Sequence, residues 1–161
     1  MSEFRPRDPG YAERVRGSFA RQPMMAHIGA ELARVAPGFC EIRMPYRREL
    51  TQQHGYVHGG ALATIADSAA GYAAFTLMPA GTSILTVEYK LNLLRPGLGE
   101  VMVARGRVIK PGKTLTVVSA DVYALKDGQE SLCLTSIQTL MALPGRPDAP
   151  EGASAPGGAG R

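Results

Sequence analysis

A single acidic side chain, Asp67, stands in an apolar segment that carries no other charge from residue 59 to residue 79. The stretch around it, HGYVHGGALATIADSAAG over residues 54–71, places two histidines and two adjacent glycines before the acid. A carboxylate among apolar neighbours loses hydration, which raises its pKa unless hydrogen bonds compensate. Such a group suits general-base or nucleophilic chemistry. Asp67 is therefore the first catalytic candidate, with an ordinary exposed polar residue as the alternative.

Gly59 and Gly60 lie where the helix that carries Asp67 is expected to begin. The unpaired backbone N–H groups in the first turn of a helix favour negative charge. Because glycines leave this backbone uncovered, a carbonyl oxygen could approach closely enough to accept hydrogen bonds. The turn would then serve as an oxyanion hole. The alternative is that the two glycines only permit a tight turn into the helix, and both explanations can hold together.

A helical wheel at ~100° per residue separates a bulky face from a face of small residues. The bulky face, which suits a core, carries Leu62, Ile65, Ala69 and Tyr72. The face shared with Asp67 consists of Gly60, Ala63, Thr64, Ala70, Gly71 and Ala74. This smooth face would allow another element to approach the helix closely.

The spacing between the helix start and the acid points to two chains. Asp67 follows His58 by nine residues (67 − 58 = 9). Nine residues place it about half a turn away in azimuth and ~13 Å along the helix axis. The helix start and Asp67 of one chain therefore cannot hold the same small reacting group, whereas two antiparallel copies of the helix could. The sequence predicts a dimer with shared active sites.

Hydrophobic periodicity predicts an α+β domain in which an antiparallel sheet packs on one long central helix. The expected elements, in chain order, are a short amphipathic helix starting at Tyr11, a hairpin over 29–35 and 39–46, the central helix over 59–77, and strands over 85–93, 101–110, 113–125 and 131–142. The domain would span 11–143. Residues 1–10 and the tail 144–161, rich in Pro, Gly and Ala, are expected to be disordered.

The strand over 85–93 is expected to alternate strictly between two faces. One face would carry Leu85, Val87, Tyr89, Leu91 and Leu93, and the other would carry Thr86, Glu88, Lys90 and Asn92. This pattern predicts a leucine-rich core face and places Thr86 on the polar face.

Composition excludes several classes of protein. The net charge of +4 is scattered along the chain, without the basic stripe of a nucleic-acid-binding surface. No apolar run reaches the ~18 residues of a membrane span, and the N-terminus has no signal-peptide core, so a cytoplasmic protein is expected. Two cysteines are too few for a disulfide framework, and His54 with His58 lacks the third ligand that a zinc site needs.

Three segments together resemble the PaaI-like hotdog-fold acyl-CoA thioesterases. They are HGYVHGGALATIADSAAGYA (54–73), LTVEYKLNLLRP (85–96) and VIKPGKTLTVVSADVY (108–123). The resemblance extends over roughly residues 19–143. His-Gly-Gly followed by Asp at this spacing, on a helix that leads into a Thr-Val-Glu strand, is a more specific signal than any of its parts.

The resemblance implies hydrolysis of an acyl-CoA thioester to a free acid and coenzyme A. It implies that Asp67 acts as general base or as nucleophile, and that the backbone N–H of Gly59 polarises the thioester carbonyl. His58 would help to position that end of the site. Gln52 would line the pocket near the leaving sulfur, and Thr86 would orient the attacking water.

The resemblance further implies that Arg95, Lys110 and Lys113, with Gly60, bind the coenzyme A part of the substrate. Charged turn residues are more often simply solvated, which is the alternative for each of these side chains. In the family two subunits join their sheets around back-to-back helices, and dimers commonly pair into homotetramers. No separate cofactor and no metal are expected, because coenzyme A is part of the substrate.

Two other functions remain open at the level of sequence. A hotdog hydratase or dehydratase would place a catalytic histidine and acid differently, and a non-catalytic acyl-CoA-binding protein would share the fold. The acyl group is also open, since phenylacetyl-type, other aryl and aliphatic groups are all compatible with the pattern.

Overall fold

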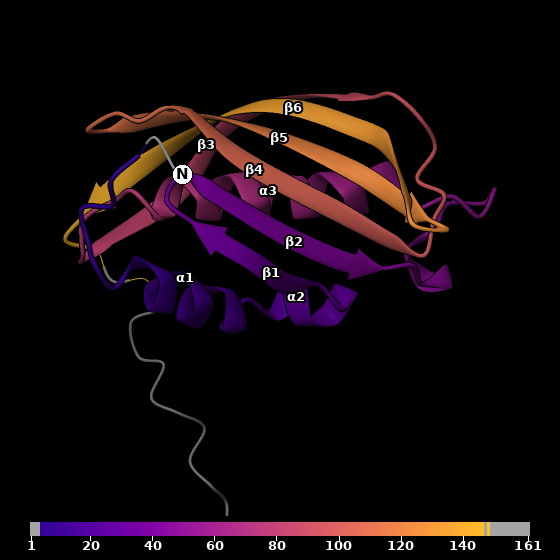
Figure 1. Ribbon diagram of the computed structural model, residues 1–161, viewed down its shortest axis with the longest axis horizontal. Helices are drawn as coiled ribbons and strands as arrows, with labels where there is room; N and C mark the ends of the chain where they lie inside the picture. The colour runs from indigo at the N-terminus through magenta and orange to yellow at the C-terminus, as the bar shows by residue number, and fades with distance from the viewer. Residues whose placement is uncertain (1–3, 147, 149–161) are drawn as a thin grey trace, which may run out of the picture.

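A six-stranded antiparallel sheet curves around one long helix in the computed structural model, which describes residues 4–146 and 148 (Figure 1). The helices are α1 (Tyr11–Ala20), α2 (Pro23–Ile28), the 3-10 turn η1 (Arg48–Leu50) and α3 (Gly59–Phe75). The strands are β1 (Glu31–Ala36), β2 (Phe39–Pro45), β3 (Thr82–Leu93), β4 (Val101–Lys110), β5 (Leu115–Lys126) and β6 (Gln129–Pro144). The expectation of an antiparallel sheet around a central helix is confirmed.

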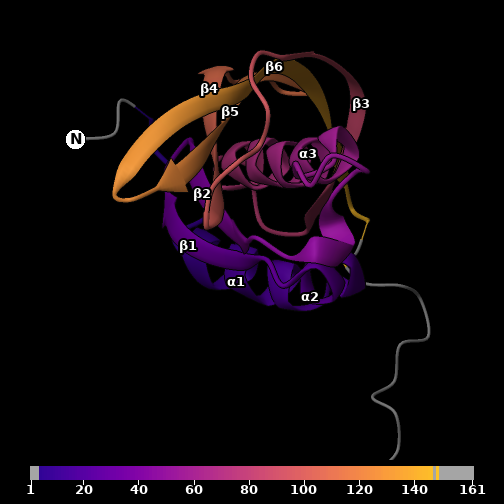
Figure 2. The same cartoon turned by 90° about the vertical axis from the view of Figure 1, so that its right-hand side faces the viewer.

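The strands follow the order β1-β2-β4-β5-β6-β3, so β1 and β3 form the two edges. Figure 2 shows α3 enclosed by the curved sheet, with α1 and α2 beside β1. The expected helix at Tyr11, the hairpin, the central helix and the four later strands are all present. No helix in the described part of the chain is long and apolar enough to cross a membrane.

The chain ends differ in detail from the expected domain limits. Strand β6 continues to Pro144, and residues 4–10 form no helix or strand, yet the Asp8 carboxylate lies 3.0 Å from the guanidinium of Arg14 in α1. Helix α2 was not predicted, because six residues are too few to show a helical period. The rest of the segments expected to be disordered, residues 1–3, 147 and 149–161, lies outside the described residues.

Helix α3 approaches the sheet so closely that a glycine is required below it. A Cβ atom added to Gly106 of β4 would lie 2.2 Å from the backbone oxygen of Ala69. The predicted bulky face of α3 is buried, and Leu62 and Ile65 are at most 1% exposed. This contact fixes which face of α3 turns away from the sheet.

The small-residue face of α3 that carries Asp67 is accessible over fewer turns than the helical wheel predicts. Gly60, Thr64 and Asp67 remain partly or fully exposed, but Ala70 and Ala74 are completely buried, so their assignment to the open face was wrong. The reason is that neighbouring elements cover the last turns, where Arg14 of α1 donates a hydrogen bond to the backbone oxygen of Phe75, the last residue of α3. A wheel treats all turns alike, whereas neighbouring elements cover only one end of this helix.

Strand β3 contains a bulge between Thr86 and Glu88, which changes the side chains that face α3. Thr86 pairs with Leu140, whose side chain is completely buried on the α3 side of the sheet, and Leu91 faces the same side. Leu85 faces away and is 51% exposed. The predicted strict alternation, with Thr86 on the outer polar face, was therefore wrong, because the bulge inserts one extra residue.

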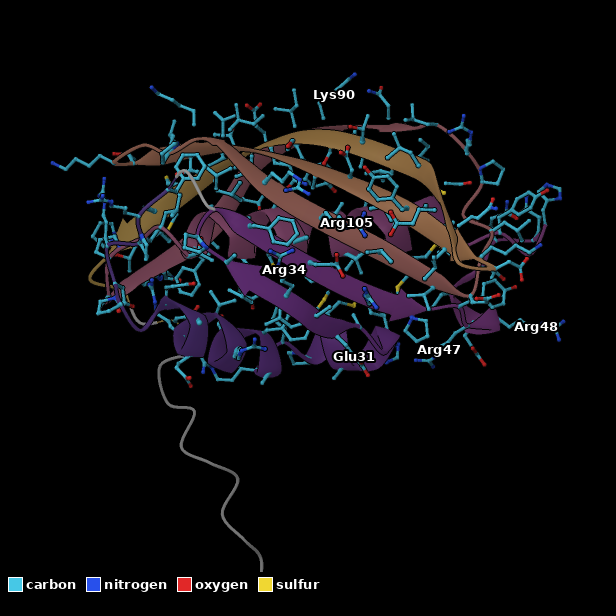
Figure 3. All side chains as sticks on the ribbon, in the orientation of Figure 1. Glu31, Arg34, Arg47, Arg48, Lys90 and Arg105 are labelled. Atoms are coloured by element: carbon cyan, nitrogen blue, oxygen red, sulfur yellow. The ribbon has the colours of Figure 1, made fainter. Side chains whose placement is uncertain are left out.

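A network of ion pairs occupies the face of the sheet that is turned away from α3. The carboxylate of Glu41 accepts hydrogen bonds from Arg43 at 3.0 Å and from Arg105 at 2.9 Å, and Arg105 also pairs with Glu130. Burial raises the pKa of Glu41, but the two arginines outweigh it and leave the pKa lowered. Figure 3 shows Arg105 and Arg34 on this outer face. Part of the positive charge of the chain thus has a structural role.

Candidate active site

Asp67 and Thr86 come together where α3 crosses the bulge of β3. The Thr86 hydroxyl donates to the Asp67 carboxylate, with 2.7 Å between Oγ1 and Oδ1. Burial raises the pKa of Asp67, and the hydrogen bond from Thr86 lowers it only in part. Within the described residues the other carboxylate oxygen, Oδ2, has no hydrogen-bond partner. The arrangement leaves one oxygen oriented by Thr86 and one oxygen able to accept a proton or attack a carbon.

Two cavities of about 320 Å³ each flank Asp67. Gln22, between α1 and α2, lines both of them, and its Nε2 donates to the Tyr72 hydroxyl at 2.9 Å. Sequence reasoning missed Gln22, because it lies 45 residues before Asp67 (67 − 22 = 45) and belongs to no motif. Only the tertiary fold brings it to the acid.

The first turn of α3 presents a free donor. Within the described part of the chain, the backbone N–H of Gly59 has no hydrogen-bond partner. His58 is the N-cap residue, and its Nδ1 accepts from the N–H of Gly60 at 2.9 Å. The neutral imidazole must therefore carry its proton on Nε2. A Cβ atom on Gly59 would lie 2.8 Å from Leu93 Cδ1, so the glycine also lets β3 pack against the helix start.

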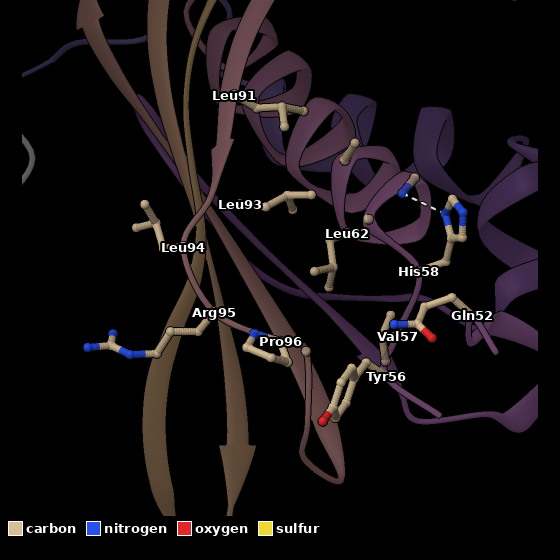
Figure 4. A pocket seen from close by; sticks show the side chains of 14 residues that line it. Gln52, Tyr56, Val57, His58, Leu62, Leu91, Leu93, Leu94, Arg95 and Pro96 are labelled. Carbon is tan, nitrogen blue, oxygen red and sulfur yellow. Dashed lines mark hydrogen bonds between the residues drawn. The ribbon is translucent and has the colours of Figure 1, made fainter. Parts of the chain in front are cut away.

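A cavity of about 750 Å³ opens at this helix start (Figure 4). Gln52, His58, Gly59 and Gly60 line it, as does Arg95 after β3. The Gln52 carboxamide oxygen accepts from the backbone N–H of His54. This bond turns the Gln52 side chain so that its Nε2 has no partner in the described residues and is available as a donor. In Figure 4 the guanidinium of Arg95 extends away from His58.

The basic residues that the resemblance assigned to coenzyme A do not gather in one chain. Arg95 lines the cavity at the start of α3, whereas Lys113 lines a different cavity of about 250 Å³ beside Leu77 and Met78. Lys110 is exposed at the last position of β4. A single subunit therefore holds these cations at opposite ends of α3.

Asp67 and Gly59 are likewise separate within one chain. They are eight residues apart on the same helix (67 − 59 = 8), which corresponds to ~12 Å along its axis. Asp67 does not line the cavity at Gly59, although Gly60 and Ala63 line both that cavity and one of those beside Asp67. Among the described residues, no group of three or more His, Cys, Asp or Glu side chains is placed to hold a metal ion.

Comparisons with known proteins identify the family and the fold. A family model described as the thioesterase superfamily matches residues 54–131. The chain is similar to the crystal structure of a thioesterase family protein from Silicibacter pomeroyi, with 54% identity, a TM-score of 0.83, and coverage of 84% of this chain and 100% of that one. It is 33% identical over 92 residues to the acyl-coenzyme A thioesterase 13 of Homo sapiens, which is 56% of this chain and 65% of that protein.

The PaaI protein of E. coli, from the phenylacetic acid degradation operon, has the same fold. Its structure superposes with a TM-score of 0.75 at 18% identity, over 85% of this chain and 96% of PaaI. At this identity the likeness concerns the fold alone.

Proposed function

The chain belongs to the thioesterase superfamily, with a PaaI-like hotdog fold, and from this premise we propose that it hydrolyses acyl-coenzyme A to a free acid and coenzyme A. The observation that carries the proposal is Asp67, a half-buried carboxylate with a raised pKa that is oriented by Thr86. The similarity to a human acyl-coenzyme A thioesterase supports coenzyme A as the thiol.

We assign the stabilisation of the oxyanion to the backbone N–H of Gly59. This donor has no partner in the described chain, and it lies at the start of a 17-residue helix, where partial positive charge favours an anion. The thioester carbonyl oxygen gains negative charge as its carbon becomes tetrahedral. Donors fixed in advance at that position lower the barrier, and one such donor is worth about 3–4 kcal/mol.

Asp67 of one subunit is proposed to act on a carbonyl held by Gly59 of a second subunit. The ~12 Å between the two groups along one helix is too long for both to contact one reacting carbon. In an antiparallel dimer, the open face of α3 would bring each Asp67 to the other subunit's helix start. Small residues on this face, such as Ala63 and Thr64, leave room for the approach.

The edge strand β3 supports such a dimer. It is 12 residues long, lies at the end of the sheet, and exposes large apolar side chains, with Val87 at 55% and Tyr89 at 50% exposure. A long apolar edge of this kind pairs readily with another strand. Pairing of β3 with β3 of a second copy would provide hydrogen-bond partners for the backbone groups at this edge and continue the sheet across both subunits.

Two routes for Asp67 fit this geometry. As a general base, its Oδ2 takes a proton from water while the water oxygen attacks the thioester carbon and the coenzyme A thiolate leaves. As a nucleophile, Oδ2 attacks the carbon itself, the thiolate leaves, and water then hydrolyses the resulting anhydride. Rapid-quench mass spectrometry separates them, because only the second route produces an acyl adduct on Asp67.

A thiol-release assay over a panel of aryl and aliphatic acyl-CoA thioesters tests the proposal. The wild-type protein should release coenzyme A from at least one of them, and Asp67→Ala should abolish this release while the oligomer remains intact by gel filtration. Glu88→Ala is the matched control, because this acid is on the outer face of the same bulge, paired with Thr139. Unchanged turnover by Asp67→Ala would overturn the proposal, and tight acyl-CoA binding without any hydrolysis would favour a binding protein.

A further inference from the structure

One of the two cavities beside Asp67 has an apolar wall on the β3 side and a polar wall on the α1 side. Asp67 and Thr86 line it together with the side chains of Ile84 and Leu140. Its volume of about 320 Å³ lies at the lower end of the range of ~300–1,000 Å³ for small-molecule pockets. A carbonyl positioned at Asp67 could therefore extend its acyl group into this space.

Gly71 of α3 also lines this cavity. A Cβ atom added to it would meet no heavy atom within 4 Å, so packing inside the chain does not require a glycine there. Glycine is disfavoured in a helix interior because the unfolded chain loses more freedom there than with alanine. The residue leaves open space one helical turn beyond Asp67.

A second wall of the cavity is polar and is held by its own hydrogen bonds. The Tyr72 hydroxyl accepts from Gln22 Nε2 at 2.9 Å and lies 3.2 Å from Ser18 Oγ. The ring of Tyr72 also contacts Phe19, with 5.8 Å between the ring centroids. Because these groups pair with one another, this wall is fixed without any help from a ligand.

Asp148, from the segment after β6, completes the lining. Arg21, the C-cap residue of α1, holds it with one nitrogen, Nη2, which lies 2.8 Å from the Asp148 carboxylate and 2.9 Å from its backbone oxygen. A hydrocarbon chain that reached this wall would have to displace or desolvate a charged carboxylate. The cost of desolvating a charge is high compared with the gain from burying a methylene.

We propose that Asp148, positioned by Arg21, is the specificity-determining residue that ends the acyl pocket and restricts the enzyme to short acyl groups. The inference rests on the proposed function, because it takes the group next to Asp67 to be the acyl part of a thioester. Arg21 acts only through Asp148 and is a positioning residue. Arg14, which also interacts electrostatically with Asp148, pairs with Asp8.

The test compares straight-chain substrates from butanoyl-CoA to dodecanoyl-CoA. The kcat/KM of each is measured for the wild type, Arg21→Ala and Asp148→Ala. Arg16→Ala is the matched control, because it removes another exposed arginine of α1 that has no ion pair in the described residues. Half-exposed ion pairs contribute little to stability, so both variants should fold, and Tm verifies this.

Both pocket variants should shift the preference toward longer chains. The ratio of kcat/KM for dodecanoyl-CoA to that for butanoyl-CoA should rise at least about tenfold, since changes of one methylene in apolar pockets are worth about 10- to 200-fold. The double variant Arg21→Asp with Asp148→Arg restores the ion pair and should return the ratio toward that of the wild type. An unchanged ratio in both single variants would overturn the proposal.

Calorimetry with S-alkyl-CoA thioethers of the same lengths separates this proposal from the proposed function. These compounds bind without being hydrolysed. If the wild type hydrolyses thioesters with a profile that neither variant alters, the role of Asp148 is wrong and the thioesterase activity stands. If nothing is hydrolysed but the variants bind longer thioethers more tightly than the wild type, the role of Asp148 stands and hydrolysis is wrong. If neither hydrolysis nor thioether binding occurs, both are wrong.

Discussion

The chemistry proposed for Asp67 depends on a balance between burial and one hydrogen bond. Burial raises the pKa of the carboxylate and so makes it a stronger base than an exposed aspartate. The Thr86 hydroxyl stabilises the ionised form and holds Oδ1, which leaves Oδ2 as the oxygen without a hydrogen-bond partner among the described residues. At the residue scale, the proposed site thus combines a desolvated acid with a single donor that favours its ionised form.

Thr86→Val should move the acid limb of the pH–rate profile to higher pH. The reaction needs ionised Asp67, so kcat/KM falls as the pH drops through the pKa of this group. Removing a hydrogen bond to the charged form raises that pKa further. The profile is measured by thiol release, with Thr139→Val on the outer face of β6 as the control. An acid limb that stays in place or moves to lower pH would refute this assignment of Thr86.

Two contacts between elements place the site. The close approach of α3 to β4 at Gly106 fixes the rotation of the helix, and with it the direction in which Asp67 points. The bulge in β3 turns Thr86 toward the helix. Both contacts depend on the path of the backbone. Substitutions that push the backbone apart should therefore disturb the site more than substitutions that change a surface charge.

Gly106→Ala and Gly71→Ala form a matched pair that tests the fit of α3. The added methyl at Gly106 would lie 2.2 Å from the Ala69 backbone oxygen, whereas at Gly71 it would meet no heavy atom within 4 Å. The first should lower the free energy of unfolding by about 1–3 kcal/mol through overpacking. The second should leave it unchanged or raise it by about 0.5–1 kcal/mol. Urea unfolding measures both, and equal effects would contradict the close contact.

Local pattern was sufficient to predict most elements and the first candidate residues. The 3.6-residue period predicted α3 and the face that carries Asp67, and the alternation of apolar residues predicted the strands. The bulge at Thr86, the burial of Ala74 and the position of Gln22 could not be predicted. Each of them depends on which distant element packs against the residue, and a periodic pattern along one chain contains no such information.

At the scale of the whole molecule, one subunit does not bring the two parts of the proposed site together, and β3 is one of the two edge strands of the sheet. The proposed carbonyl-binding part is at the start of α3, and the acid is in its third turn. The apolar edge strand β3 lies next to the acid through Thr86. A two-fold dimer through β3 would complete both proposed sites at once, so assembly and activity would then be inseparable.

Val87→Lys should weaken this dimer and reduce activity with it. A charge on an edge strand opposes pairing with a second strand. Ile137→Lys is the matched control, because Ile137 is equally exposed at 59% but belongs to β6, whose two edges are already paired. Sedimentation velocity should show a lower mass for Val87→Lys than for Ile137→Lys. Loss of activity without any change in mass would argue against β3 as the interface.

The most direct test of the shared site mixes two inactive variants, Asp67→Ala and Gly59→Val, whose added Cβ would lie 2.8 Å from Leu93 Cδ1 and so displace the start of α3. Each variant alone should be inactive as a dimer. After subunit exchange, verified by native mass spectrometry, the mixture should regain about a quarter of wild-type thiol release, because half of the dimers are mixed and each mixed dimer has one intact site. A fully exchanged mixture that remains inactive would contradict the claim that Asp67 acts on a carbonyl held by the other subunit.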